Sequence, residues 1–145
     1  MTLSLNLSIK GAKEALDMQR AMRKRLSKTG VAMDRAAVMM LKDVLEHFRD
    51  QAGPSGAWKP LSPITIKRRR EGGGGAKILM DKGLLRNSIQ PSAGEDFARV
   101  GTNVFYAPQH QFGTGRVPQR EFLWLSDVAK DKITRMIGEF VVEGK

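Results

Sequence analysis

Two histidines and the serines that could approach them are the side chains most suited to proton transfer or nucleophilic attack. His110 lies in the segment PQHQFG, where an imidazole could act as a general base. No Ser, Asp or Glu lies beside it in sequence, although folding could bring Ser88 or Ser126 close. We expect a structural hydrogen bond from the His110 imidazole, with a hydrolase built from these groups as an alternative.

His47 lies in a stretch with helical periodicity. Asp43 is four residues before it and Asp50 three residues after it, and residues at these spacings are neighbours on a helix surface. The pattern therefore predicts an exposed ion pair or hydrogen bond for His47 rather than catalysis.

The sequence offers few groups that could bind a metal or a cofactor. It contains no Cys, and its His and carboxylate residues lack the spacing of zinc or calcium sites. Glu95 and Asp96 are adjacent, so we expect them to be turn residues with their side chains apart. The glycines at 72–75 could cradle a phosphate, but neither Gly-Lys-Ser/Thr nor a preceding apolar strand accompanies them. We predict no metal, no cofactor, and a flexible hinge at this glycine run.

Positive charge is concentrated in two blocks of a chain whose formal net charge is +10. Residues 1–30 hold seven Lys or Arg against two acidic residues, and residues 59–86 hold eight against two. The second block contains the run Lys67, Arg68, Arg69 and Arg70. Such a run can meet phosphates or an acidic protein, or it can be a solvated helix face. No aromatic residue interrupts it to stack on bases, so sequence-specific reading is not expected.

Regular hydrophobic periodicity predicts the secondary structure near the two ends of the chain. Residues 3–9 alternate apolar and polar side chains, as in a half-buried strand. Residues 12–28, and the stretch from Gly30 to about Gln51, place apolar residues three or four apart, as in amphipathic helices. The tight Thr29–Gly30 turn predicts that these two helices pack antiparallel. Ser126 opens a last helix with Asp127 in its first turn. The expected buried stripe of that helix is Val128, Ala129, Ile133, Met136, Ile137 and Phe140.

Turn residues divide the middle of the chain. Gly and Pro predict a loop at 52–61, and Ser62 before Pro63 predicts the start of a short helix that runs to about Arg70. Residues 88–93 and 97–104 predict a β-hairpin. The fold class is therefore α+β. The two N-terminal helices and the C-terminal helix would pack on one face of a small antiparallel β-sheet, with a long extended loop arm at about 52–82.

Length and composition fit one domain over residues 1–145 with a modest core. The chain is 41% hydrophobic but only 6% aromatic and contains eight Met, so Met and aliphatic residues are expected to fill the core. No run reaches the roughly 20 apolar residues that a membrane-spanning helix needs. We expect synthesis in the cytosol without a signal peptide.

A series of short motifs runs from about residue 45 to residue 140. They are Phe48 with GPSG at 53–56 and WKPLSP at 58–63, ILM at 78–80 with Gly83, Leu84 and Ser88-Ile89, VGTN at 100–103 with Tyr106-Ala107, the motif His110-Gln111-Phe112-Gly113, and PQR at 118–120 with Phe122-Leu123. In this order and spacing they resemble the virion morphogenesis, or tail-completion, family of Mu-like tailed phages. Trp124 stands where that family often has Gly, and Asp81-Lys82 precede Gly83 where a small polar residue is more usual.

The resemblance implies a structural protein, not an enzyme, that completes the tail or joins it to the head. It would be a subunit of a homo-oligomeric ring, expected to be a hexamer, in the virion neck. Assembly would take place in the host cytoplasm. The implied partners are head connector or adaptor proteins, tail tube or terminator proteins, and possible packaged DNA in the lumen, with no membrane. Expected interface anchors are Trp58, Leu61, Ile78, Leu79, Met80, Tyr106 and Trp124, while Phe105 and Phe112 could be anchors or core. The alternative function is a DNA-binding accessory or regulatory protein that uses the basic run.

Overall fold

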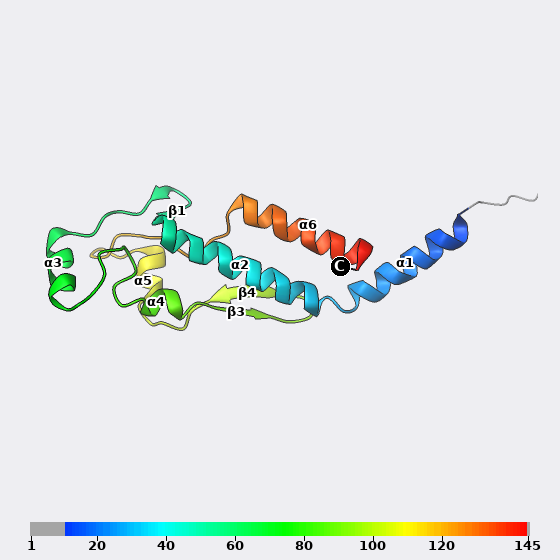
Figure 1. Cartoon of the computed structure of the whole chain (residues 1–145), viewed down its shortest axis with the longest axis horizontal. Helices are drawn as coiled ribbons and strands as arrows, with labels where there is room; N and C mark the ends of the chain where they lie inside the picture. Colours follow the sequence, from blue (N-terminus) through cyan, green and yellow to red (C-terminus); the bar gives the residue numbers. More distant parts are fainter. Residues whose placement is uncertain (1–10, 145) are drawn as a thin grey trace, which may run out of the picture.

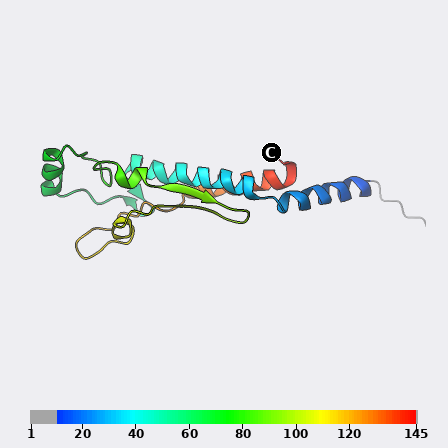
Figure 2. The same cartoon turned by 90° about the horizontal axis from the view of Figure 1, so that it is seen from below.

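The computed structural model describes residues 11–144, and its organising element is the long helix α2 (Gly30–Asp50). The predicted strand at 3–9 lies outside the described residues. One side of α2 packs on an antiparallel hairpin of β3 (Gln90–Ala93) and β4 (Ala98–Gly101). Helix α6 (Asp127–Glu143) runs along another side of α2, as Figures 1 and 2 show. The fold class α+β is confirmed, with α2 as the helix that lies directly on the hairpin.

Small residues allow this close packing. Ala32, Ala36 and Ala37 are all buried along α2, and small side chains let a second element approach the helix axis. In the hairpin, Gln90 pairs with Gly101 and Ala93 with Ala98. The backbone N–H of Gly94 donates to the oxygen of Phe97 and closes the turn, so the predicted hairpin is confirmed.

Helix α1 (Ala12–Leu26) extends beyond the N-terminal end of α2 instead of folding back along it (Figure 1). It touches the end of α6, where the Arg25 guanidinium donates to the backbone oxygens of Val141 and Val142. The prediction that α1 and α2 pack antiparallel is therefore wrong. The hairpin and α6 pack on the sides of α2 that bury the most residues, and α1 contacts the end of α6 instead.

The chain between α2 and the hairpin forms the arm predicted at 52–82. It contains β1 (Ala52–Gly53) and β2 (Gly56–Ala57), which pair, then α3 (Pro63–Glu71), and it is followed by α4 (Leu84–Asn87). The predicted loop at 52–61 thus holds a minimal hairpin. Ser62 caps α3 by accepting from the N–H of Thr65, with Pro63 at the first turn, as predicted. Both ends of the arm meet the body, and α3 lies at the far end of the molecule from α1 (Figure 1).

The core lies where α2, the two ends of the arm and the segment before α6 converge. It contains Val44, Phe48, Trp58, Leu79, Leu85, Ile89, Ala107 and Phe122, and the two phenylalanines are fully buried. The predicted aliphatic contribution is confirmed, since five of these eight residues are aliphatic. The predicted Met contribution is wrong, because no Met among residues 11–144 is buried. The rings of Phe48, Trp58 and Phe122 complete the core, because a large ring buries much apolar area.

Two further elements differ from expectation. Helix α5 (Ala107–Phe112) occupies what the sequence predicted as an irregular connection. In α6 only Ala129 is buried, because the helix packs on one side of α2 and only its end touches α1, and Val128 is 63% exposed. Ile133, Met136, Ile137 and Phe140 are half-buried, so the predicted stripe faces inward without reaching the core.

Candidate functional site

Two of the predicted interface anchors lie inside the protomer. Trp58 is 5% exposed; its ring packs edge-on against Phe48 at 5.7 Å between centroids, and its Nε1–H donates to the Glu121 oxygen over 3.0 Å. Leu79 is 7% exposed in the same core. Both side chains fasten the arm to the body within the protomer. A role for Trp58 and Leu79 at an interface stays a prediction.

The other predicted anchors are half-buried. Ile78, Met80 and Tyr106 pack against the core from outside, and Leu61 lies at the start of the arm. Trp124 stacks on His47 with ring centroids 4.2 Å apart. These side chains keep a surface that another subunit could touch, and their interface role stays a prediction.

The most exposed aromatic side chains flank α5. Phe105 precedes the helix and is 85% exposed, and Phe112 ends it at 74%. The sequence did not decide whether Phe105 and Phe112 belong to the core or to an interface. The structure places both side chains at the surface. We call them the α5 surface. Apolar rings so exposed are typical of protein contacts.

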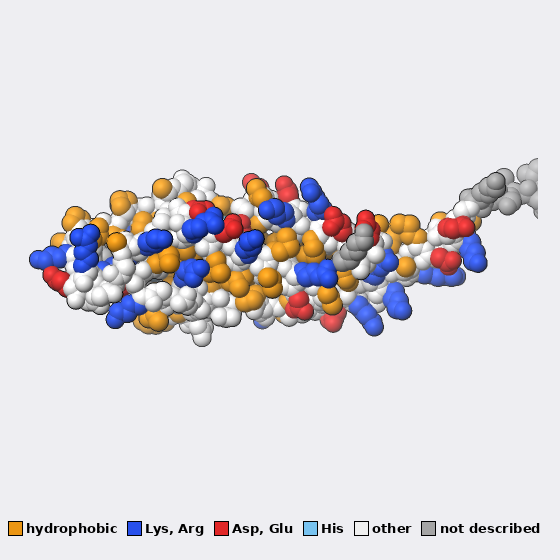
Figure 3. All heavy atoms as spheres, viewed as in Figure 1, with side chains coloured by type: hydrophobic (Ala, Val, Ile, Leu, Met, Phe, Trp, Pro, Cys, Tyr) orange, Lys and Arg blue, Asp and Glu red, His pale blue; other side chains and the backbone are white. Residues whose placement is uncertain are grey.

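The basic run divides into one inward and three outward side chains. Lys67, Arg68 and Arg70 are exposed on α3, and Lys67 approaches Glu71 at 4.0 Å. Arg69 turns back, and its guanidinium donates to the oxygens of Gly75 and Lys77. Figure 3 shows basic side chains over α3, over α1 and along the face between them. A role of the outward three in contacting DNA or a partner stays a prediction.

The glycine run forms a hydrogen-bonded turn beside Arg69. The N–H of Gly74 donates to the Arg69 oxygen, and that of Gly75 to the Asp81 oxygen. A Cβ on Gly75 would lie 2.8 Å from the backbone oxygen of Met80, which is too close for any other residue. Close approach explains this glycine, and flexibility of the run before assembly stays a prediction.

Gln111 is the structural centre of the motif at 110–113. Its Oε1 accepts from the backbone N–H groups of Phe122 and Leu123, and its Nε2 donates to the Leu123 oxygen. The amide therefore pairs with this backbone as a neighbouring strand would, and it holds α5 against the segment that leads into α6. Gly113 has φ 74° and lies against Gln119, so both its conformation and its packing require glycine.

His110 does not form the expected structural hydrogen bond through Nδ1, which is buried without a partner in the part of the chain described. Its backbone oxygen instead accepts from the Arg120 N–H over 2.7 Å. Burial, helped by the charges of Arg120 and Arg69, lowers the pKa of His110 below its ordinary value of 6.5.

The Arg120 guanidinium, itself buried, donates to the oxygens of Lys59 and Pro60 and fixes the base of the arm.

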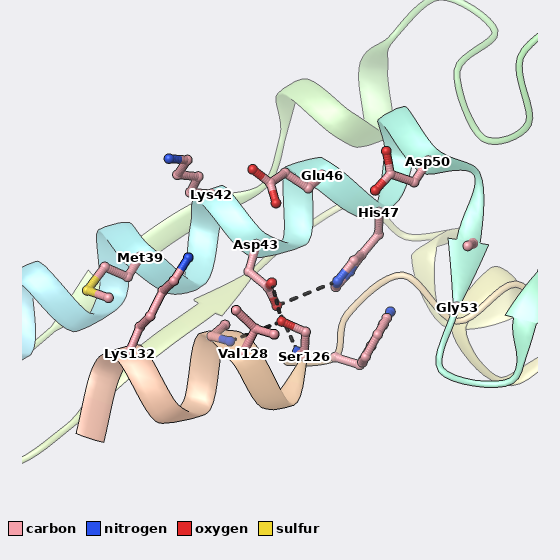
Figure 4. Close-up of a pocket in the computed structure, with 13 residues that line it drawn as sticks. Met39, Lys42, Asp43, Glu46, His47, Asp50, Gly53, Ser126, Val128 and Lys132 are labelled. Carbon is pink, nitrogen blue, oxygen red and sulfur yellow. Dashed lines mark hydrogen bonds and ion pairs between the residues drawn. The ribbon is translucent and has the colours of Figure 1, made fainter. Parts of the chain in front are cut away.

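Sequence reasoning missed a polar cluster between α2 and α6 (Figure 4). Asp43 accepts from the Ser126 N–H over 2.8 Å and from its hydroxyl over 2.6 Å. On its other side lies His47 Nε2 at 3.5 Å, while His47 Nδ1 meets the Phe122 oxygen at 3.1 Å. The prediction of an exposed His47 is wrong, because the side chain is buried between the helices. Asp43 is four residues before His47 in sequence, but only the fold shows that Ser126 completes the cluster.

This cluster lacks the geometry of a nucleophile. In a catalytic triad the histidine lies between serine and carboxylate, whereas here Asp43 lies between Ser126 and His47. The Ser126 hydroxyl donates to Asp43 and accepts from the Ala129 N–H as the cap of α6. The Ser88 hydroxyl likewise donates to the Leu85 oxygen and meets Thr102 at 2.6 Å. Both serines thus serve local structure.

The described part of the chain has neither a cluster of metal ligands nor a helix suited to a membrane. Residues 11–144 contain no group of three or more His, Asp or Glu that could hold a metal ion. Over the same residues, no helix is both long enough and apolar enough to cross a membrane.

Comparison with known proteins identifies the family. The model of the phage virion morphogenesis family matches residues 8–141, nearly the whole chain. No curated protein and no solved structure matches significantly. The chain therefore belongs to the phage virion morphogenesis family, and its role lies in the assembly of a phage virion.

Proposed function

We propose that this protein completes the tail, or joins tail to head, as a subunit of a homo-oligomeric ring in the virion neck. It acts by contacts with copies of itself and with adjoining virion proteins, and not by turnover of a substrate. The family supports a role in virion assembly. The proposal of a ring in the neck rests on one observation, the exposure of helix α1.

Helix α1 has an apolar face that is largely uncovered, because among residues 11–144 it packs only against the end of α6. None of its residues is buried, and Leu16, Met18 and Leu26 are each at least half exposed. A 15-residue helix with so little tertiary packing is marginal in water, because nucleation is costly and propensity alone adds little. A neighbouring subunit that covers this face would stabilise the helix.

The two candidate contact surfaces are unlike each other. Helix α1 protrudes from one end of the molecule, whereas the α5 surface lies towards the opposite end (Figures 1 and 2). Contacts between unlike surfaces repeat from copy to copy, and they close into a ring when the rotation between copies allows it. Such a ring is the architecture proposed here, with head connector and tail tube or terminator proteins as its axial partners.

Sedimentation of the purified full chain tests ring formation. We expect one closed oligomer for the wild type and smaller species for Leu16→Asp with Met18→Asp. Both side chains are exposed, so circular dichroism should show that the variant keeps its folded body. Val128→Asp on α6, 63% exposed, is the matched control and should leave the oligomer intact. A wild type that stays monomeric at all concentrations would contradict the ring.

Particles made without this protein test the place in assembly. We expect free tails beside DNA-filled heads in electron micrographs. Complementation with the wild type should restore joined particles, and complementation with the α1 double variant should not. Normal infectious virions in the absence of the protein would rule out the joining role.

The DNA-binding alternative draws on the three outward side chains of α3. Lys67, Arg68 and Arg70 are exposed in the last turns of that helix. If they neutralise phosphates, gel shifts should weaken steeply with salt, and Arg68→Gln with Arg70→Gln should reduce the salt slope by about two. If DNA showed no change of mobility in the gel near physiological salt, the DNA-binding alternative would be ruled out.

A further inference from the structure

A second apolar surface, separate from α1 and the α5 surface, forms a groove along α2. The groove has a volume of about 470 Å³, and the segment 77–86 forms its other wall. Its apolar floor comes from Val38, Leu41 and Leu45 on α2, with Met80 opposite. Val38 is 60% exposed, and the other three are half-buried. Nothing among the described residues covers it.

The shape of the groove fits a helix. Val38, Leu41 and Leu45 are spaced three and four residues apart, so they form one ridge on the surface of α2. A second helix packs against such a ridge with an apolar stripe of its own at the same spacing. Met80 provides an unbranched side chain that adapts to the stripe it meets.

The rim of the groove is strongly basic. Lys42, Arg49, Lys77 and Arg86 surround the apolar floor, against a single carboxylate, Glu46. Arg49 also pairs with Asp50 at 2.9 Å, which reduces the charge that it can offer. The remaining excess of positive charge favours acidic side chains beside the apolar stripe of an incoming helix.

Charge also decides against this chain as its own ligand. The unpartnered helix α1 carries five basic and two acidic side chains, so the rim would repel it. Helix α6 carries four acidic and three basic side chains, but its apolar side already rests on α2. We therefore propose that the groove docks an acidic amphipathic helix from a different protein. This goes beyond the proposed ring, which needs contacts between copies only.

Fluorescence anisotropy with designed peptides tests the proposal on the full-length protein. The probe is a labelled 18-residue helix with Leu at i, i+3, i+4 and i+7 and Glu on its flanks. Its controls are the same stripe flanked by Lys, and an acidic peptide of scrambled order that has no stripe. We expect the Glu helix to bind at least about tenfold more tightly than either control. Equal binding of the scrambled peptide, or no binding of the Glu helix, would overturn the proposal.

Variants locate the binding. Val38→Asp should weaken the Glu helix at least about tenfold, and Ile64→Asp, a change at an 80% exposed site on α3, should not. Lys42→Glu with Arg86→Glu should reverse the preference towards the Lys helix. Thermal melts check that each variant folds, and sedimentation checks that Val38→Asp still forms the oligomer. If Val38→Asp dissociates the oligomer instead, the groove binds a second copy and the proposal of a different partner fails, whereas the proposed ring survives.

Discussion

Helices α1 and α2 follow each other in the chain, and both place apolar residues three or four apart, yet their surroundings differ completely. Six residues of α2 are buried against the hairpin, α6 and the core. Helix α1 buries none and leaves Leu16, Met18 and Leu26 exposed. An amphipathic pattern shows that a face needs covering, but it does not show whether the cover comes from the same chain.

The comparison separates residues that make the protomer from residues that make the assembly. Substitutions around α2 should lower the free energy of unfolding of the single chain. Substitutions in α1 should leave that free energy nearly unchanged and weaken contacts between copies.

The largest loss of stability is expected from Phe48→Ala. Phe48 is fully buried on α2 and contacts the rings of Trp58 and Phe122. Removing the ring leaves a cavity, and we expect a loss of about 3–5 kcal/mol in urea unfolding at concentrations where the chain is monomeric. Phe105→Ala, at an 85% exposed site, is the matched control and should change little. Equal effects of the two changes would contradict the assigned core.

Gln111→Ala should come next, with a loss of about 2 kcal/mol. The change removes the partner of two backbone N–H groups and one backbone oxygen in the Phe122–Leu123 segment. Groups left without partners in a part-buried site are costly. Gln111→Glu keeps the acceptor but not the donor, so urea unfolding should place its stability between the wild type and Gln111→Ala. A ranking with Gln111→Glu below Gln111→Ala would argue against the amide pairing.

Ser126→Ala tests how α6 is fastened to α2, with an expected loss of about 1 kcal/mol. The hydroxyl caps α6 through the Ala129 N–H and also donates to Asp43. Ser126→Thr retains the hydroxyl and should retain most of the stability in the same thermal melt. If both variants melt alike, the hydroxyl contributes nothing.

A pH dependence should arise from His110 at the base of the arm. Burial lowers its pKa in the folded state, so the unfolded chain binds the proton more readily. Stability contributed by neutral His110 is therefore present above pH 6.5 and is lost as the pH falls from 6.5 through the lower folded pKa. His110→Gln should flatten this part of a plot of unfolding free energy against pH. An unchanged slope in the variant would assign the dependence to other groups.

The smallest effect on stability is expected in α1 itself. Met18→Ser changes a half-exposed side chain, and we expect less than about 0.5 kcal/mol in the monomer. The same change should weaken the oligomer in sedimentation, because a neighbour would bury that side chain. A large loss of monomer stability would show that α1 packs within its own protomer.

Local signals predicted most element boundaries. Periodicity located α1, α2 and α6, turn residues located the hairpin, and Ser62 and Ser126 cap their helices as expected. Helix α5 was missed because a six-residue helix around a proline has too few turns to show periodicity. The burial of His47 was missed because Asp43 and Asp50 indicated a polar face, whereas the fold places Phe122 and Trp124, in the segment before α6, against its ring.

The residues that hold the arm and α5 in place also required the structure. Trp58, Gln111 and Arg120 each bind backbone atoms distant in sequence, through contacts that no spacing rule encodes. Residue type indicated that large aromatics matter, but it could not separate a buried Trp58 from an exposed Phe105.

By itself the sequence determined the family, the α+β class, the positive charge and the positions of the main helices, because these depend on residue types and short spacings. Only the tertiary structure decided which apolar faces are covered, which arginine turns inward and which carboxylate meets Ser126. Those outcomes depend on contacts between segments that are separated in sequence, and such contacts form only when the whole chain packs.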